Sequence, residues 1–350
     1  NNQENEGEIK MAKAVKLADI AKIMNVSTVT VSKALSDQKG VSEEMREKIK
    51  HLADEMGYKS PSTAKMMSAK KSYNIGVVVS ERYLDQYESF YWQMYQAVAT
   101  KAVSKECFTM LEVLGTDAEQ NLELPKILKE HKVEGLIILG LLKEDYLNMM
   151  VQNMDVPFIC LDFYDRKQES DAVVTDNFYG MYRLTNYLFE MGHKDIAYVG
   201  TLLYTESITD RYFGYTKALL EHGQQVKPDW IISDRNIDDG QRGDDFDFML
   251  PEKMPTAFVC NCDLTAGILI NSLQKKGYRV PEDISVVGFD NFIHPGICKV
   301  GITTYEVDIK EMARKTINNL IKKMNHESYK QGISIVEGHM VIKDSVAKRS

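Results

Sequence analysis

Residues 17–38 read LADIAKIMNVSTVTVSKALSDQ, and this stretch decides the fold of the N-terminal part of the chain. Apolar residues spaced by three and four positions predict one face of a short helix: Leu17, Ile20, Ala21 and Met24. Residues 25–27 interrupt the pattern, and Ser27 is a suitable N-cap for a second helix. A third helix is predicted after Ser42, with an apolar stripe at Met45, Ile49, Leu52, Ala53 and Met56. Three short helices with a tight turn between the first two predict a helix-turn-helix unit.

The outer face of the second helix is small and hydroxylated if Val31, Ala34 and Leu35 face inward. Such a surface suits the major groove of DNA. Hydroxyls reach phosphates or base edges, valine contacts a thymine methyl group, and lysine reaches guanine acceptors. The alternative is a small helical bundle with no role in DNA binding. The candidate DNA-contacting residues of this face are Ser27, Thr28, Val29, Thr30, Ser32 and Lys33.

Charge is divided unevenly along the chain. Residues 10–71 hold 13 basic and 7 acidic side chains, whereas residues 72–350 hold 30 basic and 41 acidic ones. A basic head on an acidic body is typical of a nucleic-acid-binding unit attached to another domain.

The remaining composition points to a cytoplasmic protein. Five cysteines, an odd number in a long chain, indicate reduced thiols. No apolar run reaches the roughly 18 residues of a membrane span, and residues 1–13 read as a polar, disordered leader rather than a signal peptide.

From residue 73, short apolar runs alternate with helical stretches. This alternation predicts parallel sheets with helices on both faces, arranged as two Rossmann-like subdomains. The candidate strands are 75–79, 108–113, 133–140, 156–162, 195–201, 230–233, 256–263 and 284–291.

The carboxyl ends of parallel strands are where such sheets bind ligands. Three of the strand ends stop on an aspartate, whose carboxylate can accept hydroxyls of a sugar while nearby aromatic rings stack on it. The alternative for each aspartate is a helix N-cap. The candidate effector-binding residues are Ser80, Phe90, Tyr91, Asp162, Phe163, Arg211, Cys262, Asp263 and Asp290.

The segments VKLADIAKIMNVSTVTVSKAL (residues 15–35) and VSEEMREKIKHLADEMGY (residues 41–58) resemble the DNA-binding head of the lactose/galactose repressor (LacI/GalR) family. The resemblance implies base contacts by Thr28, Val29 and Lys33, and phosphate contacts by Ser27, Thr30 and Ser32. Lys33 stands where arginine is commoner. The resemblance also implies a hinge helix that folds on the operator, with Met67 as a minor-groove wedge where leucine is usual.

Three later segments are similar to the effector domain of the same family, which has a periplasmic-binding-protein-like (type I) fold. They are VVTDNFYGMYRLTNYLFEMGHKDIAYVG (residues 173–200), DRYFGYTKAL (residues 210–219) and YRVPEDISVVGFDN (residues 278–291). The resemblance implies effector contacts at Asp162, Arg211 and Asp290 and an aromatic pair at Phe90 and Tyr91. Cys262 stands where asparagine is usual, so a weak thiol replaces an amide donor.

The expected organisation is a multidomain chain with an all-α head and an α/β body. The leader covers residues 1–13, the helix-turn-helix domain 14–59, the hinge 60–72 and the effector-binding and dimerisation domain 73–350. Within the body, the N-subdomain is expected at about 73–165 and 304–329, and the C-subdomain at about 166–303 and 330–350.

Together these observations predict a dimeric transcription regulator, a repressor that binds a pseudo-palindromic double-stranded DNA operator. A small effector is expected to control its DNA affinity. The preferred ligand class is a sugar or sugar derivative, and a nucleobase is the alternative. A sugar-binding or sugar-processing protein with the same body and no DNA role is the alternative.

No enzyme activity, cofactor or metal is predicted. Cys260 and Cys262 share one face of a strand, but no histidine or further cysteine lies close in sequence; Cys298 and the seven histidines are left as candidates in space. The chain also lacks the G-x-S-x-G, H-E-x-x-H, Walker A and G-x-G-x-x-G patterns.

Overall fold

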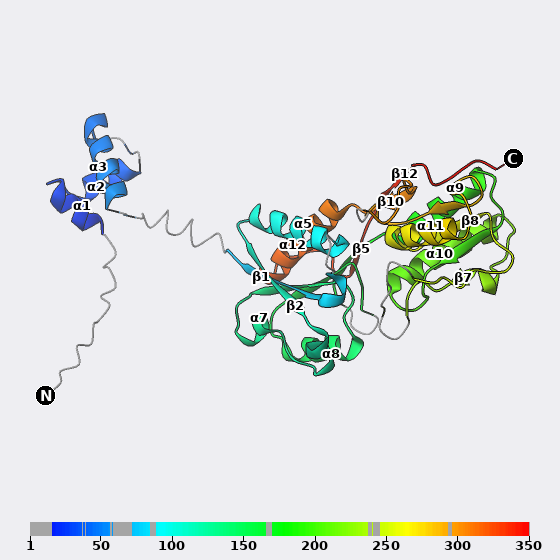
Figure 1. Cartoon of the computed structure of the whole chain (residues 1–350). Helices are drawn as coiled ribbons and strands as arrows, with labels where there is room; N and C mark the ends of the chain where they lie inside the picture. The colour runs from blue at the N-terminus through cyan, green and yellow to red at the C-terminus, as the bar shows by residue number, and fades with distance from the viewer. Residues whose placement is uncertain are drawn as a thin grey trace. The chain divides into compact units, whose positions relative to one another are not determined.

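The computed structural model describes residues 16–36, 38, 40–56, 58, 72–84, 89–165, 170–236, 240, 246–292 and 296–349. The chain divides into two compact units, residues 1–71 and 72–350 (Figure 1). In the part of the chain that the structure describes, none of the helices has the length and apolar character that a membrane crossing requires.

The first unit, the head, contains the three predicted helices: α1 (Leu17–Ile23), α2 (Thr28–Leu35) and α3 (Glu43–Glu55). Its buried core is formed by six of the predicted apolar residues, and the others pack partly buried against it: the six are Ile20, Ala21, Val31, Ala34, Ile49 and Ala53. The turn after α1 places Asn25 at a φ of 51°, in the left-handed region that asparagine tolerates better than most residues. The Val26 N–H then donates to the Ala21 carbonyl and closes the helix end.

The second unit begins with the N-lobe, which is built on a six-stranded parallel sheet in the order β11-β5-β4-β3-β1-β2. Its strands are β1 (Asn74–Ser80), β2 (Phe108–Leu114), β3 (Gly135–Leu139), β4 (Phe158–Leu161), β5 (Ala172–Thr175) and β11 (Ile333–Val336). Its helices are η1 (Glu81–Tyr83), α5 (Phe90–Val103), α6 (Thr116–Gln120), α7 (Lys126–Lys129), α8 (Glu144–Asn153) and α12 (Ile309–Met324).

Both faces of the N-lobe sheet are covered. Val77 and Val79 of β1 pack in the core with α5 and α12, whereas Val78 packs with α7 and α8 on the other face (Figure 1). A central strand buried on both faces has to be apolar along its length, which is why residues 75–79 read as an uninterrupted apolar run.

The C-lobe repeats this plan on a four-stranded parallel sheet in the order β7-β6-β8-β9. Its elements are α9 (Asn177–Glu190), β6 (Ile196–Val199), α10 (Glu206–Glu221), η2 (Pro228–Trp230), β7 (Ile231–Ile232), β8 (Ala257–Cys260), α11 (Asp263–Lys275) and β9 (Ser285–Val287). Alternate residues of β6 face opposite cores: Tyr198 packs with α9 and α10, and Val199 with α11. The predicted α/β fold with two similar lobes is therefore confirmed.

Two strands that the sequence placed in the C-subdomain belong to the N-lobe. Strand β11 pairs with β5 from Ile333 beside Ala172 to Val336 beside Thr175, and β5 pairs with β4. The expected limits near residues 166 and 330 are wrong for these two strands, because backbone pairing with β4 decides the lobe to which they belong. The four-residue run at β5 was not predicted as a strand at all.

The C-terminal part of the chain connects the two lobes again. The ribbon β10 (Thr304–Glu306) pairs antiparallel with β12 (His339–Val341). After β12 the chain returns to the C-lobe, where the Val286 N–H donates to the Ser345 carbonyl at 2.9 Å.

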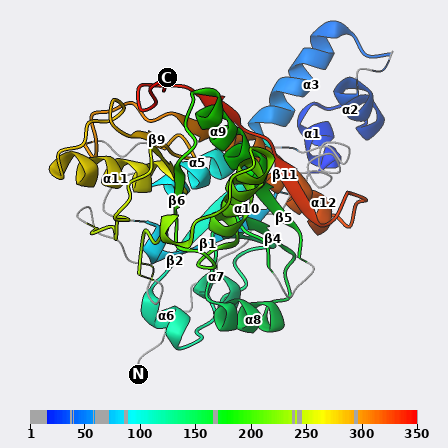
Figure 2. The same ribbon diagram turned by 90° about the vertical axis from the view of Figure 1, so that its right-hand side faces the viewer.

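Helices α9 and α10 lie side by side in the C-lobe (Figure 2) and approach each other closely at Gly214 of α10. A Cβ atom at this position would lie 2.2 Å from the Phe178 carbonyl oxygen of α9. Because backbone atoms rather than a flexible side chain occupy this space, the two helices depend on glycine for their spacing.

We expect Gly214→Ala to destabilise the body by roughly 1–3 kcal/mol, because the methyl group forces the two helices apart despite the better helix propensity of alanine. Leu220→Ala on the same helix is the matched control, since this leucine is 66% exposed. Thermal unfolding of the full-length variants checks this. An unchanged Tm for Gly214→Ala, or an equal fall for Leu220→Ala, would contradict the packing argument.

Candidate functional site

The predicted recognition face of the head lies on α2. Its N-cap is Ser27, whose Oγ accepts a 3.0 Å hydrogen bond from the Thr30 backbone N–H. Buried Val31 and Ala34 hold α2 against the other two helices, as their spacing predicts. The opposite face carries the exposed side chains of Thr28, Val29 and Ser32.

Val29 is 60% exposed although it is apolar. It lies between hydroxylated neighbours, so the face offers one methyl-rich contact among hydrogen-bonding groups. A thymine methyl beside base-edge acceptors in the major groove has the complementary pattern.

The other polar residues of α2 are partly engaged within the head. The Ser27 and Thr30 hydroxyls are 2.8 Å apart and bond to each other. Lys33 is partly buried and its ammonium group lies beside Gly40, in the connection between α2 and α3. Lys33 therefore has to extend from this position to reach a base edge.

Arg46 of α3 is a structural residue of the head that sequence reasoning missed. It is only 8% exposed, and its Nη2 donates to the Gln38 carbonyl at 3.0 Å. This bond fastens the connection that follows α2. Met67, the predicted minor-groove wedge, lies outside the described residues, as does the predicted hinge helix.

In the body, the carboxyl ends of the strands from both lobes bring polar side chains together. Asp162 directly follows β4, at a φ of 68°. Its Oδ2 accepts a 2.9 Å hydrogen bond from the hydroxyl of Tyr91, near the start of α5. Burial raises the pKa of Asp162 to about 6, although the charge of Arg211 and the Tyr91 hydroxyl oppose the shift.

Arg211 of α10 approaches Asp162 from the C-lobe. Its Nε donates to Asn177 Oδ1 at 2.8 Å, and its Nη1 donates to the Asn261 carbonyl at 2.7 Å. The guanidinium carbon lies 3.9 Å from the centroid of the Phe289 ring, which fixes the plane of the group. The structure therefore brings together Asp162, Tyr91 and Arg211, as predicted.

Aromatic rings line the N-lobe side of this interface. Tyr83 and Tyr91 have ring centroids 4.6 Å apart, and Phe90 packs edge-on against Tyr91 at 5.5 Å. Phe90 also contacts Phe292 of the C-lobe, at 6.4 Å between centroids. Tyr83 was missed because the sequence pattern offered no helix or strand periodicity at its position.

Phe163 does not belong to this aromatic group. It is buried in the N-lobe core that contains α7 and α8, so its assignment as a stacking residue was wrong. Its neighbour Tyr164 is only partly buried against the same core, and it reaches the C-lobe through its hydroxyl. The Tyr164 hydroxyl donates to Asp210 Oδ2 of α10 at 3.1 Å.

The remaining predicted residues lie deeper. Ser80 is buried at the end of β1, where it precedes η1. Asp290 has a φ of 93°, and its Oδ1 accepts a 2.9 Å bond from the Phe292 N–H. Cys262 occupies the N-cap position of α11, with its Sγ 3.4 Å from Thr265 Oγ1.

Asp263 is 2% exposed, and its carboxylate oxygens have no hydrogen-bond partner of good geometry among the described residues. The Thr304 hydroxyl is still near enough to lower its pKa, but burial and the charge of Asp290 raise that pKa well above the ordinary value. As an effector contact, Asp263 stays a prediction.

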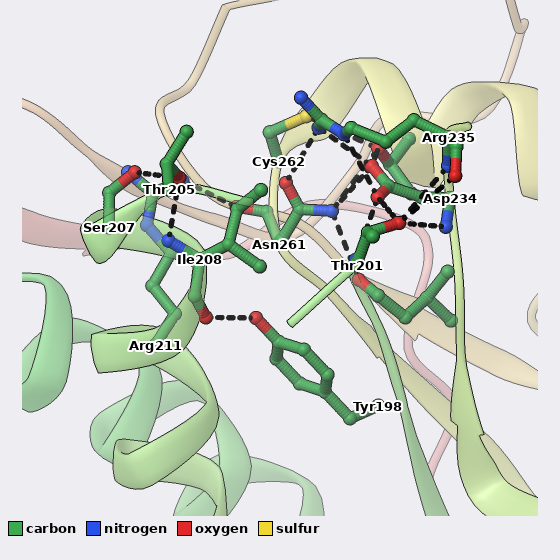
Figure 3. A network of polar contacts seen from close by, with 12 residues as sticks. Tyr198, Thr201, Thr205, Ser207, Ile208, Arg211, Asp234, Arg235, Asn261 and Cys262 are labelled. Carbon is green, nitrogen blue, oxygen red and sulfur yellow. Dashed lines mark hydrogen bonds and ion pairs between the residues drawn. The ribbon is translucent and has the colours of Figure 1, made fainter. Parts of the chain in front are cut away.

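A buried polar network that the sequence did not predict joins the strand ends of the C-lobe (Figure 3). Asp234, just after β7, is fully buried and accepts bonds from Thr201, Asn261, Thr265 and Arg235. The signal was present, because Asp234 directly follows a predicted strand, as Asp162 does. Asp234 was not predicted as a site residue because the apolar run before it is only a few residues long.

The residues at the lobe interface are largely covered by protein. Asp162 and Arg211 are 9% and 8% exposed. Two surface hollows of about 450 and 380 Å³ lie elsewhere, on the N-lobe, and no predicted effector residue lines either. Among the described residues, no three His, Cys, Asp or Glu side chains are arranged to hold a metal ion.

Comparison with known proteins agrees with this division into head and body. Residues 16–61 match the family described as bacterial regulatory proteins, lacI family, and residues 185–346 match the periplasmic binding protein-like domain. The transcriptional repressor PurR of Pasteurella multocida (strain Pm70) is 26% identical over 340 residues, which cover 95% of this chain and 99% of the relative. The transcriptional regulator RegA of Clostridium saccharobutylicum is 27% identical over 334 residues, 95% of this chain and 99% of the relative.

Solved structures show the same fold. The transcriptional regulator CelR in complex with cellobiose aligns over 95% of this chain and 99% of its own, with a TM-score of 0.66 and 21% identity. The lac repressor dimer bound to operator and the anti-inducer ONPF aligns over 96% and 100%, with a TM-score of 0.63 and 21% identity.

The helix-turn-helix head, the two-lobed body and the full-length relatives lead to one conclusion. The chain combines a lacI-family DNA-binding domain with a periplasmic-binding-protein-like domain, and it is a DNA-binding transcriptional repressor with an effector-binding body.

Proposed function

We propose that this repressor acts as a cytoplasmic homodimer whose two heads bind the half-sites of a pseudo-palindromic operator, and that a sugar or sugar derivative bound between the lobes controls its DNA affinity. Pairing of two copies through the body sets the spacing of the heads. The protein has no catalytic part in this scheme, because binding alone carries the signal.

The observation that carries the proposal is the meeting of Asp162 from the N-lobe and Arg211 from the C-lobe beside the Tyr83 and Tyr91 rings. A carboxylate accepts sugar hydroxyls, a guanidinium donates to sugar oxygens, and aromatic faces pack on the apolar face of a pyranose. A solved relative that holds cellobiose supports the same ligand class.

Ligand entry requires the lobes to separate, since Asp162 and Arg211 are nearly covered when the lobes meet. The Tyr164–Asp210 bond and the Phe90–Phe292 contact join the lobes directly, so they break or shift when the lobes move. A change of lobe angle is transmitted to the heads through the segment before residue 72. Operator affinity then changes by the coupling free energy, typically about 1–3 kcal/mol.

Replacement of Lys33 by alanine should weaken operator binding about 10- to 100-fold and relax the preference at one base pair, because a lysine contact to a base edge is lost. Lys48→Ala is the matched control, since Lys48 lies on α3 and pairs with Glu44 at 2.7 Å. Fluorescence anisotropy at one fixed salt concentration measures both. Equal affinities of wild type and Lys33→Ala would exclude the groove assignment of α2.

Thermal unfolding of the full chain with free sugars, phosphorylated sugars and nucleobases identifies the ligand class. A ligand at 100 times its Kd stabilises the folded state by about 2.7 kcal/mol, so a bound sugar raises the Tm visibly. Stabilisation by nucleobases alone would replace the sugar assignment. A chain that binds operator but responds to no compound would refute it.

Sugar binding should strengthen as the pH rises through about 6, because the ionised Asp162 carboxylate accepts hydroxyls better than the protonated acid. The folding stability of the ligand-free protein changes with pH in the opposite direction. Because the pKa of Asp162 is raised from 3.8 to about 6, the free energy of unfolding falls as the pH rises between these two values, by at most roughly 3 kcal/mol.

Calorimetric titration between pH 5 and about 8 checks this, with Asp162→Asn as the comparison. The variant is expected to bind more weakly and to lose most of the pH dependence. A wild-type affinity that does not change over this range would show that Asp162 is not the acceptor.

A further inference from the structure

Arg235 follows the buried end of β7 and reaches the lobe interface without a place in the site described so far. Its Nε and Nη2 donate to the two oxygens of Asp234, at 3.1 and 2.8 Å. A bidentate pair of this kind fixes the plane of the guanidinium as well as its position. Arg235 is therefore oriented before any ligand arrives.

The support beneath Arg235 is rigid. Asp234 also accepts bonds from the Thr201 N–H at 2.9 Å, from Asn261 Nδ2 at 2.8 Å and from the Thr265 hydroxyl at 2.8 Å (Figure 3). These partners come from the ends of β6 and β8 and from the first turns of α11. A binding residue held by such a network loses little conformational entropy when it contacts a ligand.

The second terminal nitrogen of Arg235, Nη1, takes no part in this network. The hydrogen bonds that the Arg235 side chain makes with the described residues use Nε and Nη2. The side chain keeps 13% of its surface exposed. The two N–H groups of Nη1 therefore lie on a side chain that is mostly, but not fully, covered by protein.

The surroundings of the Arg235 guanidinium are aromatic and polar. The guanidinium carbon lies 5.1 Å from the centroid of the Tyr204 ring. Arg235 and Tyr204 both influence the pKa of the Tyr83 hydroxyl, which burial raises to about 12, so Tyr83 of the N-lobe is close. The side chain also extends over Asn261 to the Cys262 thiol (Figure 3).

Charge balance decides which ligands this position accepts. Asp234 neutralises Arg235 at contact distance, and the opposite charges of Arg211 and Asp162 influence each other across the interface. A phosphate group would add negative charge near Asp162 and Asp234, whose arginine partners are already engaged. An uncharged ligand avoids this repulsion and still receives the Nη1 donors.

We propose that Arg235 is a ligand-contacting, specificity-determining residue: its Nη1 donors bind a hydroxyl or ring oxygen of an uncharged carbohydrate, in place of the amide donor that Cys262 lacks. Asp234 sets the preference for uncharged over phosphorylated sugars. This inference rests on the proposed function, since it refines the ligand class of the same site.

The test uses the full-length protein, a set of free mono- and disaccharides that includes ribose and cellobiose, and the phosphorylated forms of the same sugars. Calorimetry is expected to show binding of an uncharged sugar and at least 10-fold weaker binding of its phosphorylated form. Arg235→Gln should weaken the uncharged sugar about 10- to 100-fold, the usual effect of a lost charge-assisted donor.

Two further variants separate recognition from folding. Arg279→Gln is the matched control, because Arg279 makes the same bidentate pair with Asp283, at 3.0 and 2.7 Å, on an exposed surface. Asp234→Asn retains Arg235 but removes its counter-charge, and it should shift the preference toward phosphorylated sugars. Far-ultraviolet circular dichroism and operator binding confirm that each variant is folded.

Wild-type affinity in folded Arg235→Gln would overturn this inference and leave the proposed function intact. A wild-type preference for phosphorylated sugars would overturn it as well. An unshifted preference in Asp234→Asn would show that Asp234 does not set the charge selection. Failure of every sugar to bind a chain that still binds operator would refute both this inference and the carbohydrate assignment.

Discussion

Arg211 joins the elements on which the effector site depends. It bonds to Asn177 at the start of α9 and to the backbone beyond β8, and its guanidinium lies over the Phe289 ring beyond β9. Its charge also offsets part of the cost of burying Asp162 of the other lobe. Without Arg211 that carboxylate would be buried with only the Tyr91 hydroxyl as partner, and an uncompensated buried charge is strongly destabilising. The relative position of the two lobes and the ionisation of Asp162 are therefore linked.

Much of the fold could be predicted because its physical causes are local. Helix geometry sets the spacing of the apolar residues within each head helix, those around Ile20, Val31 and Ile49. The apolar run of β1 follows from burial on both faces of a parallel sheet. The strand-end rule also located Asp162, and the family resemblance placed Arg211. The hinge and Met67 stay predictions.

The errors arise where long-range pairing or side-chain direction decides. Strand β5 is four residues long, and its place in the N-lobe depends on backbone bonds to β4 and β11. Phe163 and Tyr164 pack against the same core, and only the Tyr164 hydroxyl reaches the C-lobe, a difference that sequence position alone does not predict. Asp234 and Arg235 gain their significance only from Thr201, Asn261 and Thr265, which are distant in sequence.

The central claim is that ligand binding in the body and DNA binding by the head are energetically coupled. The most direct measurement determines operator Kd with and without a sugar that stabilises the protein, and sugar Kd with and without operator. The account predicts that both ratios are equal and differ from one by about 5- to 150-fold, as reciprocal linkage requires. Ratios of one in both directions would show that the two sites act independently and would contradict the account.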